Sequence, residues 1–276
     1  MYVVRSAELK DMGFIMGLAE REGRNPGLSD GDCFFHADPG GFFIGERAGE
    51  RVGCISAIRY GAFGFIGLYI VKEEYRHKGY GLALWERAME RLEGCNVGLD
   101  GVVKQQENYK RYGFRLAHRN LRFSGSVTKA PPDAPCVVSA QSLPFSEVAA
   151  YDAKHFPAPR RAFLMRWLSM RNAGTLCFYR NGMLRGYGTI RQCVAGYKIG
   201  PLFADADDIA ETLFLSLAGF AKGAVVSLDI AEPNESARAL CERFGMARQF
   251  ETARMYTRFA PPLDRGAYGI TSFELG

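Results

Sequence analysis

The sequence predicts an α+β protein whose mixed α/β sheet belongs to two copies of one fold, arranged in tandem. Three observations lead to this prediction. Short strands and amphipathic helices alternate from the first residues, a proline-rich break interrupts the chain near its middle, and the order of elements before the break returns after it. A chain of 276 residues is also longer than one compact core usually requires. We therefore expect an N-terminal domain over residues 1–127, a linker over 128–135 and a C-terminal domain over 136–276.

The first half begins with a strand over residues 2–7 and a helix over 7–23 whose apolar residues recur on one side. Runs of β-branched and aromatic residues, broken by glycine-rich turns, follow. They predict three antiparallel strands in a meander, over Gly41–Arg47, Arg51–Tyr60 and Phe63–Val71. A helix with a buried stripe comes next, then a buried strand, a short helix ended by a glycine and a last strand. The stripe consists of Leu82, Trp85, Met89 and Leu92. The glycine that ends the short helix is Gly113.

The break is the segment Val127–Pro135, which has three prolines among polar residues, the usual composition of a linker. After it we expect a strand, two helices, a meander with a hairpin turn at Asn181–Gly182, a long helix, a buried strand, a helix capped by Asn234 and a last strand. Residues 97–114 and 226–246 share Val-x-Leu-Asp, a helix, and an aromatic residue followed by glycine. Any β–α–β unit can produce such a pattern, but the matching order of the other elements favours a duplicated fold.

Charge and cysteine usage exclude several classes of protein. The net charge of +5 is mild and no dense run of Lys and Arg is present, so we expect no nucleic-acid partner. The seven cysteines stand singly, and neither they nor the four histidines have metal-ligand spacing, so we expect reduced thiols and no metal site. The first residues do not resemble a signal sequence, and no apolar run is long enough to cross a bilayer. We therefore expect a cytoplasmic protein without a membrane partner.

The segment Arg76-His77-Lys78-Gly79-Tyr80-Gly81 stands directly before the amphipathic helix. A helix start has four N–H groups without partners and a partial positive charge, and glycines there let a phosphate touch the backbone. The segment therefore predicts a pyrophosphate site. It is not a P-loop, because Gly-Lys-Ser/Thr is missing, nor a dinucleotide fold, which would want a small residue in place of Leu84 and parallel strands before the loop. A flexible turn is the alternative if the glycines are considered alone.

In its setting, the stretch LYIVKEEYRHKGYGLALWERAM resembles the coenzyme A loop of the GNAT N-acetyltransferase superfamily, whose pattern is Arg/Gln-x-x-Gly-x-Gly/Ala after an apolar strand. Arg76, Gly79 and Gly81 match this pattern. The family's order of elements is similar to that of residues 1–125 throughout. The resemblance implies that acetyl-CoA is the co-substrate and that backbone amides of the loop hold its pyrophosphate. These amides would belong to Arg76, His77, Lys78, Gly79, Tyr80, Gly81 and Leu82.

The resemblance also implies where the acetyl group reacts. The strand before the loop and the following strand would splay apart. The pantetheine arm would lie in the gap against the amides of Tyr69, Ile70 and Val71, one of which would stabilise the oxyanion. Tyr109 stands where the family often has a tyrosine that protonates the departing thiolate; a tyrosine half-buried against the sheet is the alternative. Asn108 is adjacent, not at the spacing of the family's asparagine, so it contacts the cofactor or is only a surface residue.

A base must take a proton from the incoming ammonium. The strand Phe63–Val71 carries no acid, although some relatives in the family have a glutamate there. Asp100 is the nearest candidate, because burial between the splayed strands would raise its pKa. A turn-capping role before Gly101 is the alternative for this residue. The Tyr69 phenol, at the lining of the acetyl site, is a second candidate.

The second half lacks the cofactor loop. Its corresponding helix starts with Asp205, Asp207 and Asp208, which suit a helix N-terminus but repel a pyrophosphate. Cys241 occupies the position that corresponds to the tyrosine. The chain is therefore similar to two-domain GNAT proteins in which only the N-terminal domain carries the acetyl-CoA loop and the C-terminal domain walls the acceptor pocket. Candidates for contacts with a cationic acceptor are Tyr187, Asp229, Tyr256 and the tail 266–276.

Together these features predict an N-acetyltransferase that transfers acetyl from acetyl-CoA to a primary amine of a small molecule. The amine would attack directly, without a covalent enzyme intermediate. Three alternatives stay open: a protein or peptide N-acetyltransferase, an acyltransferase for longer chains, and a coenzyme A-binding sensor without catalysis. Both a monomer and a homodimer are compatible with the sequence.

Overall fold

The computed structural model describes all 276 residues. The first half of the chain forms β1 (Tyr2–Ser6), α1 (Met12–Arg21), α2 (Asp30–Ala37), β2 (Phe42–Arg47), β3 (Glu50–Tyr60), β4 (Phe63–Val71), α3 (Tyr80–Arg91), β5 (Asn96–Val102), α4 (Gln106–Arg111) and β6 (Arg115–Ser126). The second half forms β7 (Val137–Ser139), α5 (Phe145–Asp152), α6 (Arg161–Trp167), β8 (Ala173–Arg180), β9 (Met183–Gln192), β10 (Tyr197–Ala204), α7 (Asp207–Ala218), β11 (Val225–Ala231), α8 (Glu235–Arg243), β12 (Ala247–Tyr256) and β13 (Ala267–Gly269). Apart from β13, the two halves have the same order of strands and helices, as predicted.

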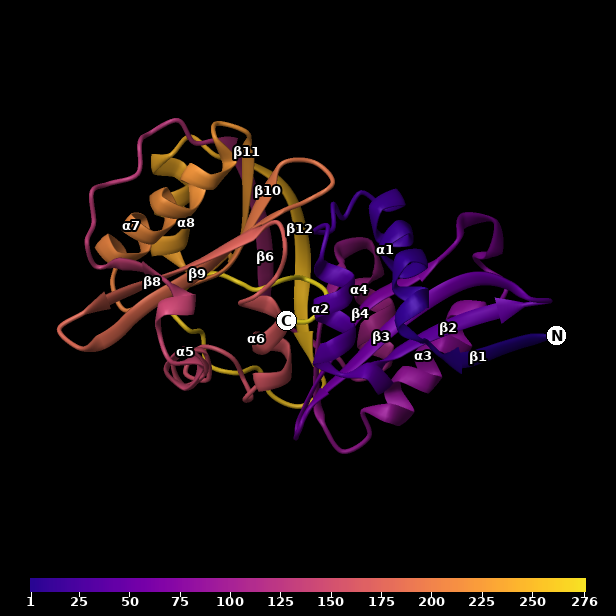
Figure 1. Cartoon of the computed structure of the whole chain (residues 1–276). Helices are drawn as coiled ribbons and strands as arrows, with labels where there is room; N and C mark the ends of the chain where they lie inside the picture. The colour runs from indigo at the N-terminus through magenta and orange to yellow at the C-terminus, as the bar shows by residue number, and fades with distance from the viewer.

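All strands belong to one sheet. Its order is β1-β2-β3-β4-β5-β12-β6-β11-β10-β9-β8-β7, and β13 pairs with β10. The first half of the chain occupies one end of this sheet and the second half the other, with helices packed on both halves (Figure 1). The pairs β4–β5 and β10–β11 are parallel and the others antiparallel. The predicted α+β class with a mixed sheet is therefore confirmed.

The last strand of each half is exchanged with the other half. β12 lies between β5 and β6, where Arg254 is opposite Asp100 and Thr252 is opposite Asn120. β6 pairs on its other side with β11. Each half of the sheet is thus completed at the centre of the molecule by a strand from the other half (Figure 1). The sequence does not predict this exchange, because a strand's own residue pattern does not specify which neighbour it pairs with.

The local elements agree well with the sequence. Strands β2, β3 and β4 form the predicted meander, each within one residue of its expected bounds. Asn181 and Gly182, at φ +53° and +74°, form the predicted turn between β8 and β9. The sequence does not predict α2, whose Asp- and Gly-rich start favours a turn. Packing on α6 stabilises this helix, since Phe34 stacks on Trp167 with ring centroids 6.1 Å apart.

Helix α3 buries a stripe that differs in part from the predicted one. Its buried side chains and the one that follows the helix are Leu84, Trp85, Ala88 and Leu92. Leu82, by contrast, is 46% exposed and Met89 is half-buried. The apolar face is centred between Leu84 and Ala88, so position 82 in the first turn faces solvent.

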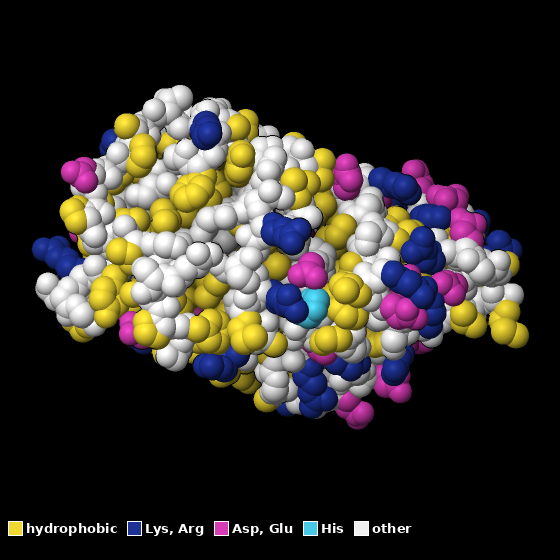
Figure 2. Space-filling view, in the orientation of Figure 1, with side chains coloured by type: hydrophobic (Ala, Val, Ile, Leu, Met, Phe, Trp, Pro, Cys, Tyr) yellow, Lys and Arg dark blue, Asp and Glu magenta, His cyan; other side chains and the backbone are white.

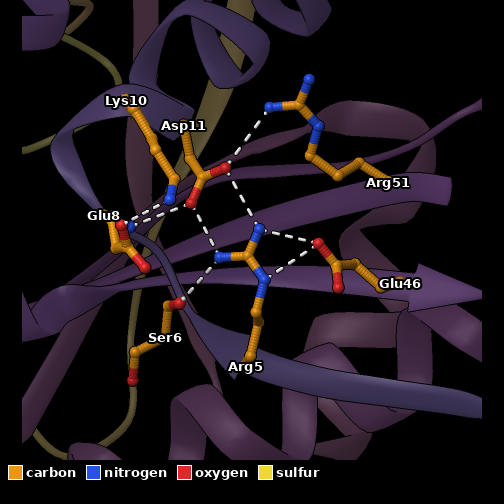
Figure 3. A network of polar contacts seen from close by, with 7 residues as sticks. All are labelled: Arg5, Ser6, Glu8, Lys10, Asp11, Glu46 and Arg51. Carbon is orange, nitrogen blue, oxygen red and sulfur yellow. Dashed lines mark hydrogen bonds and ion pairs between the residues drawn. The ribbon is translucent and has the colours of Figure 1, made fainter. Parts of the chain in front are cut away.

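A network of ion pairs fixes the start of α1 against β1, β2 and β3 (Figure 3). Arg5 Nη1 donates to Asp11 Oδ2 at 2.7 Å, and Arg5 Nε donates to Glu46 Oε1 at 2.9 Å. Arg51 Nη1 contacts the other oxygen of Asp11 at 3.3 Å. The side chain of Asp11 is only 2% exposed, so these contacts compensate for the burial of its charge.

The surface carries charges of both signs. On the face shown in Figure 2, Lys and Arg side chains are interspersed with Asp and Glu over the first half of the chain. Charged groups are sparser over the second half on this face (Figure 2). None of the helices combines the length and the apolar character that a membrane crossing requires.

Candidate active site

Helix α3 begins at an open loop. Its N-cap is Gly79, in the left-handed region at φ +81°, and no side chain caps the helix. The N–H groups of residues 77–81 have no hydrogen-bond acceptor in the chain, whereas those of Arg76 and Leu82 donate to the carbonyl oxygens of Glu73 and Gly79, each at 3.1 Å. Two of the seven predicted amides are therefore engaged, and five consecutive ones are free to bind an anion.

The two glycines of the loop are required for different reasons. The φ of Gly79 would strain a residue with a Cβ. A Cβ on Gly81 would lie 2.6 Å from the hydroxyl oxygen of Tyr69. The sequence therefore keeps the helix start bare at the two positions where a side chain would distort it or fill it. The residues fit a pyrophosphate bound by backbone amides.

The basic side chains of the loop brace it. Arg76 Nε donates to the carbonyl oxygen of Val71 at 2.9 Å, and Arg76 Nη2 pairs with Glu22 Oε1 at 2.5 Å. Lys78 Nζ donates to the carbonyl oxygen of Glu74 at 2.7 Å. Arg76 thus ties the loop to the end of β4 and to the residue that follows α1.

The predicted splay between β4 and β5 is present. The two strands pair in parallel only over Phe63–Ile66 and Asn96–Leu99, and then separate. Leu68 adopts φ +47°, and the pairing of β4 with β3 changes register next to it. The gap beyond contains a cavity of about 20 Å³ that backbone and side chains of both strands line. Tyr69, two residues before the end of β4, is one of the residues that line it.

Two predicted tyrosines line this gap. Tyr109 stacks on Trp85 with ring centroids 5.5 Å apart, and burial raises its pKa. Burial also raises the pKa of Tyr69 to about 12. Both phenols therefore stay protonated at neutral pH, which suits a proton donor and not a base. Asn108, the third predicted residue of this region, is exposed and donates to Gln105 Oε1 at 2.5 Å.

Asp100, the first candidate base, is already paired. Its carboxylate accepts hydrogen bonds from Arg254 Nε at 2.8 Å and Nη2 at 2.6 Å, and from Asn120 Nδ2 at 2.8 Å. Its side chain is 0% exposed, and this burial raises its pKa against the opposing effect of Arg254. Both oxygens are engaged, so little capacity is left for a substrate proton. The sequence does not reveal this partner, because Arg254 belongs to the exchanged strand β12.

A larger cavity of about 730 Å³ lies between the two halves of the chain, and both halves line it. Two aromatic rings, Phe250 and Phe273, contribute to its wall beside several polar side chains. Arg24, Asp100 and Val102 line both this cavity and the small one in the gap. The two cavities are therefore adjacent.

The corresponding gap of the second half is filled by the chain itself. β10 and β11 pair in parallel over Tyr197–Ile199 and then separate, and β13 pairs with β10 beyond that point. Ile270 N donates to the carbonyl oxygen of Asp229 on β11 at 2.8 Å. A Cβ on Gly200 would lie 2.6 Å from the carbonyl oxygens of Ile270 and Thr271. This half has neither the loop nor an open gap.

Of the residues of the second half that were predicted to contact the acceptor, only some line the larger cavity. Asp229 Oδ1 pairs with Arg122 Nε at 2.7 Å, Tyr187 is fully buried and donates to Asp152, and Tyr256 is buried. None of these three predicted residues lines the cavity, whereas the tail does. The tail reaches it through Phe273 and Glu274, which sequence analysis did not single out from the other tail residues. Sequence analysis also missed Arg24, in the turn after α1.

The sequence predicts no metal site. In the structure, no group of three or more His, Cys, Asp or Glu side chains is arranged to hold a metal ion.

Comparisons with known proteins agree with this geometry. Residues 14–114 match the acetyltransferase (GNAT) family, and residues 148–268 match an acetyltransferase (GNAT) domain. Holothin acyltransferase from Pseudoalteromonas sp. is 30% identical over 99% of this chain and 94% of its own length.

Solved structures share the two-domain fold. A candidate acetyltransferase from Pyrococcus horikoshii superimposes with a TM-score of 0.84 and 25% identity, over 100% of this chain and 96% of that one. A tandem GNAT protein from the clavulanic acid biosynthesis pathway has a TM-score of 0.65 and 13% identity, over 96% of this chain and 100% of that one, which shows the fold alone. The chain therefore belongs to the GNAT acetyltransferase family and is a transferase with two GNAT domains in tandem.

Proposed function

We propose that the protein is an acetyl-CoA-dependent N-acetyltransferase that binds its cofactor in the first half and acetylates a primary amine of a small molecule. The observation that carries the proposal is the run of five unpaired N–H groups, residues 77–81, at the open start of α3. This run stands at the end of β4, beside the gap that leads to the cavity of about 730 Å³. The second half has no equivalent, because β13 fills its gap.

Each group of residues in the first half would have its own role in binding or catalysis. Bound acetyl-CoA supplies the activated acetyl group. The amides of residues 77–81 hold the diphosphate, and the amides of Tyr69, Ile70 and Val71 line the pantetheine arm, with one of them donating to the developing oxyanion. Tyr109 protonates the departing sulfur, since its buried phenol stays protonated at neutral pH.

The acceptor would lie in the larger cavity. A volume of about 730 Å³ suits a small molecule, and the rings of Phe250 and Phe273 favour one with a flat apolar body. The relative from Pseudoalteromonas is named holothin acyltransferase, so holothin is one of the acceptors to be tested. We propose no nucleic-acid or membrane partner and a cytoplasmic location, which the seven free thiols support.

The experiment measures acetyl-CoA binding by calorimetry and thiol release with a panel of benzylamine, tyramine, holothin, amino acids and a peptide. We expect turnover with one or more of the small amines. The double variant Gly79→Glu plus Gly81→Glu should lose at least about tenfold in acetyl-CoA affinity, because two carboxylates repel the diphosphate. Gly94→Glu is the matched control, since Gly94 also has a positive φ and lies past the other end of α3.

Three results would contradict the proposal in different ways. Undiminished affinity in the folded double variant would remove the cofactor site from the loop. Turnover of the peptide alone, or of longer acyl-CoA in preference to acetyl-CoA, would favour the acyltransferase alternatives. Tight cofactor binding without turnover of any acceptor would favour a coenzyme A sensor.

A further inference from the structure

Three acidic side chains line the cavity between the halves, and two of them are engaged. Glu22 pairs with Arg76 at 2.5 Å, and Asp100 accepts two hydrogen bonds from Arg254. Glu274, which is 6% exposed, has no ion pair within 4.0 Å and no hydrogen bond to its carboxylate. It is the one acid of the cavity whose oxygens have no partner in the chain.

The position of Glu274 is fixed by its backbone. Its N–H and that of Leu275 donate to Ser272 Oγ at 3.3 and 3.1 Å. Its carbonyl oxygen lies 2.0 Å from where a Cβ on Gly67 would stand, so the tail packs directly on β4. Gly67 is the first residue of β4 beyond its pairing with β5, which places Glu274 where the gap opens.

Several charged groups lie near Glu274, and two of them are paired with other acids. Arg122 on β6 pairs with Asp229 on β11, and Arg191 on β9 pairs with Asp30 on α2. Lys198 on β10 donates to the carbonyl oxygen of Arg24 at 2.8 Å and has no acid within ion-pair distance. Both arginines are thus neutralised by their own acids, whereas Lys198 and Arg24, which also lines the cavity and has no ion pair, add positive charge near Glu274 without pairing with its oxygens.

We propose that Glu274 is the general base that receives the ammonium proton of the acceptor in the cavity. This inference rests on the proposed function. The ammonium nitrogen gives one proton to a Glu274 oxygen, and its lone pair then forms the bond to the thioester carbonyl carbon. The C–S bond breaks with its electron pair on sulfur, which takes a proton from Tyr109. The nitrogen of the adduct gives its second proton to the Tyr109 phenolate, which restores the phenol, and Glu274 releases the first proton to solvent, so one proton leaves per turnover.

The test compares wild type with Glu274→Gln, which keeps the shape of the side chain and removes its charge. Thiol release is measured with the most active amine of the panel as a function of pH. We expect kcat to fall about 100-fold near neutral pH, with acetyl-CoA affinity unchanged. The deficit should shrink as pH rises through the amine's own pKa, because a free amine needs no base. A residue with only a structural role would give a deficit that does not change with pH.

Glu251→Gln is the matched control. Glu251 is on β12 between Phe250 and Thr252, which line the cavity, but does not line it itself. The Glu251→Gln variant should keep full activity.

Equal activity of Glu274→Gln and wild type, or a pH-independent deficit, overturns the inference while the proposed function stands. If Glu274→Gln does not fold, Glu274→Asp gives the same readout: a reduced kcat that recovers at high pH supports the inference and an unchanged profile overturns it. If the wild type turns over no amine, the proposed function fails and this inference with it.

Discussion

The carbonyl oxygen of Glu274 lies 2.0 Å from the position that a Cβ on Gly67 would occupy. Two residues more than 200 positions apart are therefore in direct backbone contact at the start of the β4–β5 gap. The contact explains why β4 has a glycine there, since any side chain would displace the tail. The contact also places a residue of the second half beside the gap: that half has no cofactor loop, but its Glu274 lines the adjacent larger cavity.

The variant Gly67→Ala tests how much this contact contributes to stability and to catalysis. The added methyl group meets backbone atoms that cannot move without the tail, so we expect a loss of about 1–3 kcal/mol in the free energy of unfolding. Displacement of Glu274 by about 1 Å should lower kcat for amine acetylation by up to about 100-fold. Urea denaturation and thiol release measure the two effects. Gly64→Ala is the control, because a Cβ there meets side-chain atoms of Leu92 and no backbone of the tail. Full activity in Gly67→Ala would show that the contact is unimportant for catalysis.

Tyr109→Phe tests the proton donor. The ring keeps its stacking on Trp85, so stability and acetyl-CoA affinity should change little. We expect kcat to fall by about 100-fold, because the departing thiolate loses its acid. Tyr112→Phe provides the comparison: Tyr112 also contacts Trp85, at 5.1 Å between centroids, but does not line the gap. Similar kcat values in the two variants would assign Tyr109 to packing alone.

Features with a local cause could be predicted from the sequence. The alternation and turns of the meander, the glycines of the loop and the Asn181–Gly182 hairpin are each specified by neighbouring residues. Contacts between segments that are distant in the sequence could not be predicted. Arg254 reaches Asp100 only because β12 is inserted beside β5. The same holds for Glu274, whose neighbours in the chain are mostly glycines and apolar residues that do not indicate its contact with β4, and for α2, which depends on packing against α6.

The ion pairs of Asp11 predict a specific acid sensitivity. Hydrogen bonds from Arg5 lower the pKa of Asp11 from 3.8 to about 2, more than burial raises it. A lowered folded-state pKa means that Asp11 stabilises the fold above the unfolded value of 3.8, and that this contribution is lost as pH falls towards 2. Asp11→Asn should therefore cost about 1–3 kcal/mol at neutral pH, by urea denaturation, and the cost should vanish as pH falls through that range. Asp133→Asn, in the exposed linker, should cost nothing at any pH. A pH-independent cost in Asp11→Asn would contradict the ionic origin.

The exchange of β6 and β12 predicts how the two halves depend on each other. A protease site placed in the exposed segment 128–135 can be cut in the folded protein. We expect the two pieces to stay together on gel filtration and to keep their thiol-release activity, because β12 remains hydrogen-bonded to β5 and β6, and β6 to β11. They should separate only in denaturant. Residues 1–127 produced alone should not show a cooperative unfolding transition, since the edge of β5 and both edges of β6 would lack their partners. Two pieces that separate in native buffer and each unfold cooperatively would show instead that each half is an independent domain.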